Sequence, residues 1–347
     1  MNITFLIGNG FDKGLGLNTG YRDFYEKYCE NSAEDDSNIK DFKKMLAEGK
    51  KYPDINDWSD FETSFGVHSK DFPTPNDDDY AVQKQRYIAR FRHFAKKFNT
   101  YLEEEEKRAD FSNTKAITTT MDNALSTYYH IQNENKEAIQ NLYKSFSSSP
   151  LIYNFITFNY TKCIDKCVEA YKKHISNYSS KSVGSMLHLH GYVDDNMIMG
   201  VNDPSQIKNP LFAKDQDIIR GIVKPQQSYS VRSNYEKPVI ETINKSDIIC
   251  IYGMSIGETD KKWWKIIANW LAKNDRHVLI ILSYDDKYDK RFPFEKIEFT
   301  DKVTNRFLQL SEMTEDEQKT IRPRIFVEFN HTVFGMKLAK REALIAQ

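Results

Sequence analysis

Residues 3–12 read Ile-Thr-Phe-Leu-Ile-Gly-Asn-Gly-Phe-Asp, a short apolar run that leads directly into a Gly-x-Gly turn. An apolar run of this length is too short for a helix and is typical of a parallel strand that is covered on both faces. Gly8 and Gly10 permit a turn in which backbone amides approach a phosphate at the start of the next helix. We therefore predict an α/β fold in which this turn binds a nucleotide. The alternative is a sharp strand-to-helix turn without a ligand.

The turn departs from two familiar nucleotide-binding motifs. The glycine after Gly10 is Gly14, one residue too late for the G-x-G-x-x-G fingerprint of dehydrogenases. A Walker-type G-x-x-x-x-G-K-[ST] motif does not follow it either. The pattern thus indicates a nucleotide but does not say which one.

The composition indicates a globular protein with no strong charge bias. The 347 residues, 39% of them hydrophobic, are enough for a large buried core. The 49 basic and 50 acidic residues give a formal net charge of -1, which creates no global attraction to nucleic acid. No apolar run approaches the length of a membrane span, and the first strand begins too early for a signal peptide. We expect a cytoplasmic protein without membrane contact, whose four cysteines are reduced thiols.

The second half of the chain alternates between apolar runs and amphipathic segments. Such alternation predicts a Rossmann-like, doubly wound and mostly parallel sheet. Thr314 and Glu317 have the spacing of a capping box within the last helical segment. The expected strands are residues 3–7, 154–158, 186–189, 197–201, 247–252, 277–282 and 324–329, the expected helices are 161–171, 261–273 and 301–320, and residues 284–298 are expected to form a solvated loop.

The region between the first strand and residue 150 has a helical pattern instead. Apolar side chains recur at three- and four-residue steps over residues 87–102, which predicts one buried helix face. Weaker helical patterns cover residues 21–30, 41–48 and 135–146, and residues 71–79 are expected to form a loop. We therefore expect residues 1–19 and 150–335 to form the core, residues 20–149 a helical insertion or lid, and residues 336–347 a C-terminal tail.

Asn159 follows a predicted strand, in the segment Thr157-Phe-Asn-Tyr-Thr161. In open α/β sheets, ligands bind at the carboxyl ends of the strands, so Asn159 is a candidate contact. An Asn in this place is also a common helix N-cap, whose side chain accepts hydrogen bonds from the first free amides. The sequence leaves both interpretations open.

Two histidines end another predicted strand, in the segment Leu187-His-Leu-His-Gly191. Strand alternation places both histidines on one face and both leucines on the other. A neutral histidine at a strand end can act as a general base near physiological pH, although a structural histidine is an equal alternative. We do not predict a metal site, because no further ligand is placed near His188 and His190 by the sequence.

The segment after the strand at residues 247–252 is rich in small residues. Ser255 is a candidate ligand for a ribose or phosphate. Asp260 is either a ligand contact or the cap of the following helix, and capping alone would explain it. The tryptophans of that helix have core spacing and are not expected to form an aromatic binding platform.

Together and in this order, these segments resemble the AbiH family of bacterial phage abortive-infection proteins. The resemblance spans most of the chain, and the N-terminal turn is its most specific part. The segments that carry it are Gly8-Asn-Gly-Phe-Asp12, Trp58-Ser-Asp-Phe-Glu62, Phe158-Asn-Tyr-Thr161, His190-Gly191, and Tyr252-Gly-Met-Ser-Ile-Gly257 with Asp260.

The same order is more distantly similar to the sirtuin-like NAD-hydrolysing domains of phage-defence systems. That resemblance implies that Gly8 and Gly10 hold the diphosphate, that Asn159 and His190 are catalytic, and that Gly253 and Ser255 contact the ribose. Thr161 stands where those domains have an acid, and the Cys-x-x-Cys zinc ribbon of deacetylating sirtuins is absent, which argues against protein deacylation. The nucleotide-binding residues predicted from the four segments are Gly8, Asn9, Gly10, Phe11, Asp12, Tyr160, Gly253, Ser255 and Asp260.

These resemblances imply an NAD-hydrolysing effector that needs no prosthetic group. NAD or a related nucleotide would be its substrate and a phage component its trigger, and the sequence leaves a homo-oligomer open. Asp60 and Glu62 are candidate lid contacts, with a solvated helix start as the equal alternative. A non-enzymatic nucleotide sensor or a scaffold that recognises a phage component is the competing class. A nuclease is less favoured, because Asp194, Asp195 and Asp203 lack evident metal-ligand spacing.

Overall fold

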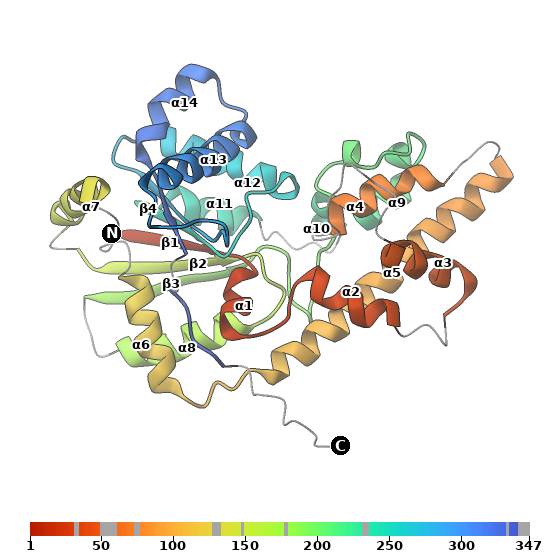
Figure 1. Ribbon diagram of the computed structural model, residues 1–347, viewed down its shortest axis with the longest axis horizontal. Helices are drawn as coiled ribbons and strands as arrows, with labels where there is room; N and C mark the ends of the chain where they lie inside the picture. The colour runs from red at the N-terminus through yellow and green to blue at the C-terminus, as the bar shows by residue number, and fades with distance from the viewer. Residues whose placement is uncertain are drawn as a thin grey trace. The chain divides into compact units, whose positions relative to one another are not determined.

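The computed structural model divides the chain into two compact units, and Figure 1 shows their helices and strands. The sheet unit comprises Met1–Leu17, Arg108–Leu189 and Tyr235–Gln347, and the helical unit comprises Asn18–Lys107 and His190–Asn234. The structure describes residues 1–30, 35–48, 61–72, 77–126, 133–146, 149–176, 180–230, 236–330 and 333–338.

The sheet unit contains a parallel sheet whose strand order is β3-β2-β1-β4-β5-β6. The order reverses between β1 and β4, as in dinucleotide-binding Rossmann folds. This confirms the predicted fold class. The strands are β1 (Asn2–Ile7), β2 (Leu151–Thr157), β3 (Lys181–His188), β4 (Ile248–Tyr252), β5 (Val278–Ser283) and β6 (Ile325–Phe329).

The register brings the carboxyl ends of four strands to one edge. Ile7 pairs with Thr157 of β2 and with Tyr252 of β4, and Thr157 pairs in turn with His188 of β3. The segments that leave these strands therefore start at the same level of the sheet. All four predicted site segments begin at this carboxyl edge.

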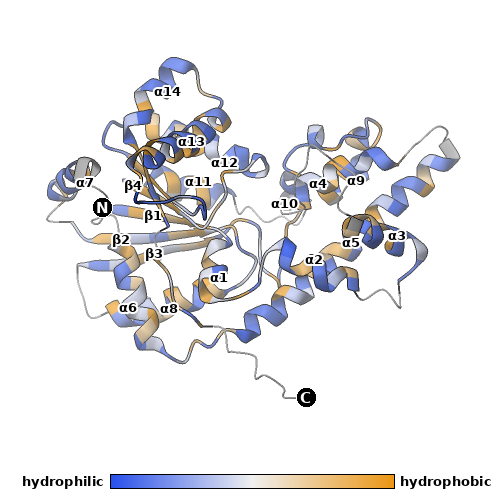
Figure 2. Cartoon of the chain, viewed as in Figure 1, coloured by the Kyte–Doolittle hydropathy of each residue, from blue (hydrophilic) through white to orange (hydrophobic). Residues whose placement is uncertain are grey.

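Helices cover both faces of the sheet, and the strands are buried accordingly. Phe5 and Ile7 belong to one apolar cluster and Leu6 to the other, which follows from the two-residue period of a strand. Figure 2 shows apolar residues concentrated in the strands. The first face is covered by α1 (Gly10–Leu15), α6 (Thr114–Leu125), α7 (Asn133–Ser145) and α8 (Cys163–Ile175), and the second by α11 (Glu236–Asn244), α12 (Lys261–Ala272), α13 (Pro293–Ser311) and α14 (Glu315–Ile321).

The helical unit packs around the long helix α5 (Asp77–Arg108). Its buried face carries the aromatic residues that the three- and four-residue spacing predicts. The ring of Phe94 stacks on that of Phe61 with the centroids 3.5 Å apart and the planes 6° apart. The other helices of this unit are α2 (Tyr21–Glu30), α3 (Ser37–Glu48), α4 (Phe61–His68), α9 (Gln216–Ile222) and α10 (Lys224–Ser230), with short 3₁₀ helices η1 (Ser69–Asp71), η3 (Pro204–Gln206) and η4 (Phe212–Lys214); η5 (Glu258–Asp260) and η6 (Arg322–Arg324) lie in the sheet unit.

Two predicted segments are wrong. Residues 197–201 are not a strand: they form only the bridge between Val201 and Val223, and side chains of neighbouring helices take up their backbone groups. The expected loop at 284–298 ends early, because α13 begins at Pro293, whose fixed φ and missing amide suit a first helical position. The capping box of Thr314 and Glu317 is confirmed at the start of α14.

The boundaries of the two compact units differ from those of the helical insertion predicted at residues 20–149. Helices α6 and α7 pack on the sheet, and residues 190–234 belong to the helical unit. Helix α5 begins at Asp77, inside the loop expected at 71–79, of which residues 73–76 lie outside the described residues. In the expected tail, Met336 and Leu338 are buried against the sheet, and residues 339–347 lie outside the described residues.

Candidate functional site

The Gly-x-Gly turn after β1 interlocks with the turn after β4. The amide of Gly8 donates to the carbonyl of Tyr252 at 2.9 Å, and the amide of Gly10 donates to that of Gly253 at 2.8 Å. A Cβ atom on Gly10 would lie 2.5 Å from the Cα of Gly253, so only glycine permits this approach. Both amides expected to approach a phosphate are thus used within the protein in this conformation. The glycines join the strand ends on either side of the switch point.

Asp12 is buried in the first helical turn after this motif, with 1% of its surface exposed. Its Oδ2 accepts a hydrogen bond from the hydroxyl of Thr161 at 2.6 Å. The contact ties the start of α1 to the segment that leads from β2 into α8. It also gives a physical reason for threonine at position 161: an acidic side chain there would face the carboxylate of Asp12, whereas a hydroxyl donates to it.

Asn159 lies two residues beyond β2 and is 5% exposed. It is not the helix cap that its position allowed, because α8 begins at Cys163 and its N-cap residue is Lys162. The backbone amide of Asn159 donates to the hydroxyl of Thr157 at 3.1 Å. Its side-chain Nδ2, although buried, has no hydrogen-bond partner among the described residues. A buried donor left unpaired costs about 1–3 kcal/mol, so this amide group is an unusual feature of the carboxyl edge.

The two histidines predicted together have different surroundings. His188 ends β3, and its Nε2 lies 2.8 Å from Oδ2 of Asp165 on α8, with the imidazole almost fully buried. His190 follows after Leu189, the last residue of the sheet unit, whose amide donates to the carbonyl of Thr157 at 2.9 Å. Leu187 and Leu189 both pack in the second apolar cluster, as the strand alternation predicts, and the strand itself ends at His188. His188 is held in an ion-pair geometry, and His190 opens the irregular segment that follows.

The segment after β4 confirms one expectation and corrects another. The tryptophans of α12 are buried in the core, as their spacing predicts. Asp260 is the N-cap residue of α12, but its side chain makes no capping hydrogen bond, so capping does not explain it. Ser255 is exposed, and the carbonyl of Gly257 accepts a hydrogen bond from Nε1 of Trp264 at 2.8 Å.

Of the two acids of the predicted lid, Asp60 and Glu62, the structure describes only Glu62. Asp60 lies outside the described residues. Glu62 is 6% exposed in the first turn of α4, so the solvated helix start is wrong. Its Oε2 lies 2.6 Å from Nζ of Lys224, and its Oε1 accepts from the amide of Gly200 at 3.1 Å. Both carboxylate oxygens of Glu62 are therefore used in contacts within the helical unit.

The described part of the chain offers no group of three or more histidine, cysteine or acidic residues that could hold a metal ion. Cys163, Cys167 and Cys250 are buried free thiols. Burial, with smaller contributions from Asp12 and Asp165, raises the pKa of Cys167 to about 12. Such thiols are poor nucleophiles and poor metal ligands at neutral pH. Among the described helices, none has the length and apolar character needed to cross a bilayer.

The family model of bacteriophage abortive infection AbiH proteins matches residues 4–282. The chain belongs to the AbiH family. Family membership makes it a protein of abortive infection, a defence against bacteriophage. The matched span starts within β1, ends within β5 and contains every predicted site residue. No curated protein matches the chain.

Three residues of this AbiH chain contact predicted site residues, and the sequence did not indicate these contacts. Thr161 stood out only as a departure from the sirtuin-like pattern, and Asp165 and Lys224 did not stand out at all. They bond Asp12, His188 and Glu62, from which they are separated by 149, 23 and 162 positions in the chain. No local pattern links residues so far apart, so only homologous sequences that vary together would have indicated these pairs.

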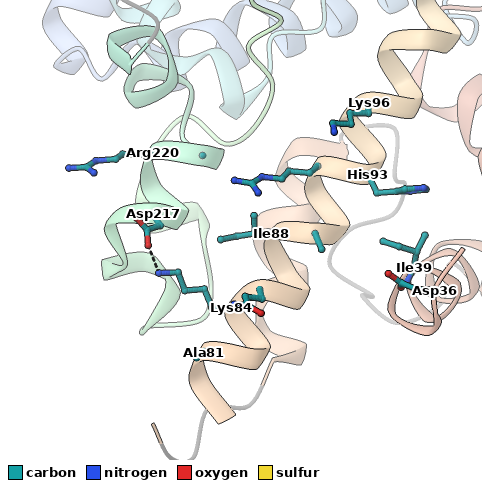
Figure 3. A pocket seen from close by; sticks show the side chains of 13 residues that line it. Asp36, Ile39, Ala81, Lys84, Ile88, His93, Lys96, Asp217 and Arg220 are labelled. Atoms are coloured by element: carbon teal, nitrogen blue, oxygen red, sulfur yellow. Dashed lines mark hydrogen bonds and ion pairs between the residues drawn. The ribbon is translucent and has the colours of Figure 1, made fainter. Parts of the chain in front are cut away.

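The helical unit of this AbiH protein has an open groove of about 1150 Å³ along α5. Figure 3 shows Ile88 of α5 pointing toward α9, and Lys84 paired with Asp217 across the gap at 2.6 Å. His93 lies on the other side of α5 and is held between Tyr28 and Asp35. Three further cations line the groove and form no ion pair within the described part of the chain: Arg92, Lys96 and Arg220.

Proposed function

We propose that this AbiH protein is an effector that binds NAD at the carboxyl edge of its sheet and hydrolyses it to nicotinamide and ADP-ribose. The observation that carries the proposal is the buried side-chain amide of Asn159 at that edge, whose Nδ2 has no hydrogen-bond partner among the described residues. A substrate hydroxyl or a water held by it would supply the missing acceptor, because a ribose carries several such oxygens.

The strand order supports a nucleotide as the ligand. In open α/β sheets, ligands bind outside the carboxyl ends of the strands, where the strand order reverses. Here that point lies between β1 and β4, and β2 with Asn159 is the next strand from it. Because the amides of Gly8 and Gly10 already donate to carbonyls, the diphosphate would have to rest on other groups of this edge.

Hydrolysis of NAD requires an oriented ribose, a water and a base. The water oxygen forms a bond to C1′ of the nicotinamide ribose, the glycosidic C–N bond breaks, and nicotinamide leaves with the bonding electron pair. In this proposal Asn159 holds the ribose or the water, and His190 accepts the proton that the water loses. No prosthetic group takes part in this chemistry, and a phage component would act as the trigger.

Nicotinamide release by the purified full chain, measured with phage lysate and without it, tests the proposal. Replacing His190 or Asn159 by Ala should lower turnover by about 10²- to 10⁴-fold. His174→Ala is the matched control, since His174 is a half-exposed histidine in the last turn of α8, toward the opposite edge of the sheet. NAD hydrolysis is refuted if the wild-type chain releases no nicotinamide under any activating condition, or if His190→Ala is as active as His174→Ala.

A second candidate function is a non-enzymatic sensor or scaffold for an anionic phage component. The groove along α5 favours it, because Arg92, Lys96 and Arg220 line one open surface without carboxylate partners among the described residues. Calorimetry distinguishes the two functions. Binding of NAD without turnover favours a sensor. Loss of phage protection in Arg92→Ala/Lys96→Ala, with nicotinamide release unchanged, would show that the groove acts in recognition.

A nuclease stays the least favoured function, and magnesium-dependent degradation of plasmid would support it.

A further inference from the structure

Residues 190–201, called the His190 loop below, have a defined conformation although they form no strand or helix. The amide of Ile198 donates to the carbonyl of His190 at 2.8 Å, which closes the loop onto its own first residue. Gly191 has a φ of 71°, and a Cβ there would collide with the carbonyl of Asn196. The backbone of His190 is therefore tied to the far end of the loop, next to Met199 and Gly200.

Side chains from three helices hold this loop within the helical unit. Asn99 of α5 donates to the carbonyl of Val193. Gln227 of α10 donates to the carbonyl of Met199 at 2.6 Å. Glu62 of α4 accepts from the amide of the next residue, Gly200, at 3.1 Å. The loop backbone thus finds its hydrogen-bond partners within the loop and in these side chains instead of a neighbouring strand, which explains a defined segment without regular secondary structure.

The carboxylate of Glu62 is itself fixed from its other side. Its Oε2 lies 2.6 Å from Nζ of Lys224, and the two side chains are 7% and 8% exposed. The amide of Lys224 donates to the carbonyl of Val201, so the same residue also holds the end of the loop. Removing either charge alone would leave the other buried without its partner. Glu62, Lys224 and the loop end therefore form one coupled unit.

We propose that Glu62 is a positioning residue for His190, an inference that rests on the proposed role of His190 as the base. Glu62 fixes Gly200 with one oxygen and is fixed by Lys224 with the other, and the Ile198 bond transmits this restraint to the backbone of His190. Because both oxygens are used inside the helical unit, Glu62 acts through the loop and not through contact with substrate.

Two matched double variants separate positioning from simple stability. Glu62→Leu/Lys224→Met and Glu62→Gln/Lys224→Met both remove the buried charge pair with side chains of similar volume. Apolar replacement of an intact buried pair, as in the Leu variant, is often neutral for stability. Only the Gln variant keeps an acceptor for the amide of Gly200. Amide hydrogen exchange of peptides covering residues 190–202, and kcat and KM for NAD, are then measured on the full chain.

We expect the Leu variant to speed exchange of this loop about tenfold or more, the effect of losing one buried hydrogen bond. Its kcat should fall by about tenfold with KM changed by less than about threefold, because the base is displaced while NAD still binds. The Gln variant should stay close to wild type in both measurements. Should the Leu variant not fold, Gln227→Leu removes the adjacent bond to Met199 and should speed exchange of the same peptides.

Hydrogen exchange tests the positioning role of Glu62, and nicotinamide release by the wild-type chain tests NAD hydrolysis. The two proposals can therefore be refuted separately. Unchanged exchange in the Leu variant overturns the positioning role, whatever the activity. Faster exchange with unchanged kcat overturns it as well, because His190 would then not depend on the loop. A wild-type chain that never hydrolyses NAD refutes the proposed function, and faster exchange in the Leu variant would still show that Glu62 fixes the loop.

Discussion

The interlocked glycine turns at the switch point make Gly253→Ala the most informative single substitution in the sheet unit. Gly253 has a φ of 68°, in the left-handed region where a residue with a Cβ costs about 1–2 kcal/mol. Its new Cβ would also lie 2.8 Å from the Cα of Gly10 and 2.8 Å from the amide nitrogen of Phe11. Overpacking against atoms that cannot move costs about 1–3 kcal/mol more. The expected loss in free energy of unfolding is therefore about 2–5 kcal/mol, a large share of the stability of an ordinary domain.

Urea denaturation followed by tryptophan fluorescence measures this loss in free energy of unfolding within the sheet unit. Three of the four tryptophans, Trp263, Trp264 and Trp270, are buried in α12 of the sheet unit. Gly14→Ala is the matched control, because Gly14 lies in α1, close to the same turn. A Cβ on Gly14 would lie no nearer than 3.7 Å to another atom, and Gly14 has no positive φ. Alanine there should be neutral or stabilise the helix by up to about 1 kcal/mol.

The close approach of the two turns is refuted if Gly253→Ala loses less than about 1 kcal/mol, a value typical of ordinary substitutions. It is also refuted if Gly14→Ala is destabilised to the same extent as Gly253→Ala. Either result would mean that the end of β4 stands too far from Gly10 for the two turns to interlock.

Three further predictions concern other parts of the sheet unit. Thr161→Val should lower the free energy of unfolding by about 1–3 kcal/mol, because the buried carboxylate of Asp12 loses a donor; an unchanged urea midpoint would contradict the contact. Hydrogen bonds from Lys261, and then from Lys265, lower the pKa of Glu312 from 4.5 to about 2. The stability that this pairing contributes is fully present above about pH 4.5 and is lost as the pH falls through about 2, and an NMR titration of Lys261→Ala should show the Glu312 midpoint moving upward. Ellman's reagent should reach Cys167 only after unfolding, since the thiol is buried and its raised pKa leaves little thiolate.

Most of the sheet could be predicted because its signals are local. Apolar runs of strand length, each followed by a glycine or an amphipathic helix, mark five of the six strands within two or three residues, although β3 starts five residues earlier than expected. The pattern failed at residues 197–201, which have the composition of a strand but no neighbouring strand to pair with. Strand formation depends on a partner that the local sequence does not contain.

The site shows the same division between local and distant information. The sequence placed Asn159 at a strand end, since the apolar run before it ends there. It left open whether Asn159 caps the following helix. The structure shows that it does not, because α8 begins at Cys163. It could not show that the amides of Gly8 and Gly10 would be taken by the end of β4, because that contact joins segments more than two hundred residues apart.

By itself the sequence determined the α/β class, the parallel sheet with its first strand predicted at residues 3–7, and the segments that meet at its carboxyl edge, because side-chain periodicity and turn residues act over a few positions. The tertiary structure alone decided which polar groups are satisfied there. It paired Asp12 with Thr161, His188 with Asp165 and Glu62 with Lys224, and left the side-chain amide of Asn159 without a partner among the described residues. The physical reason is that a hydrogen bond depends on where the folded chain brings two atoms together, and the path of the chain is set by the packing of whole elements.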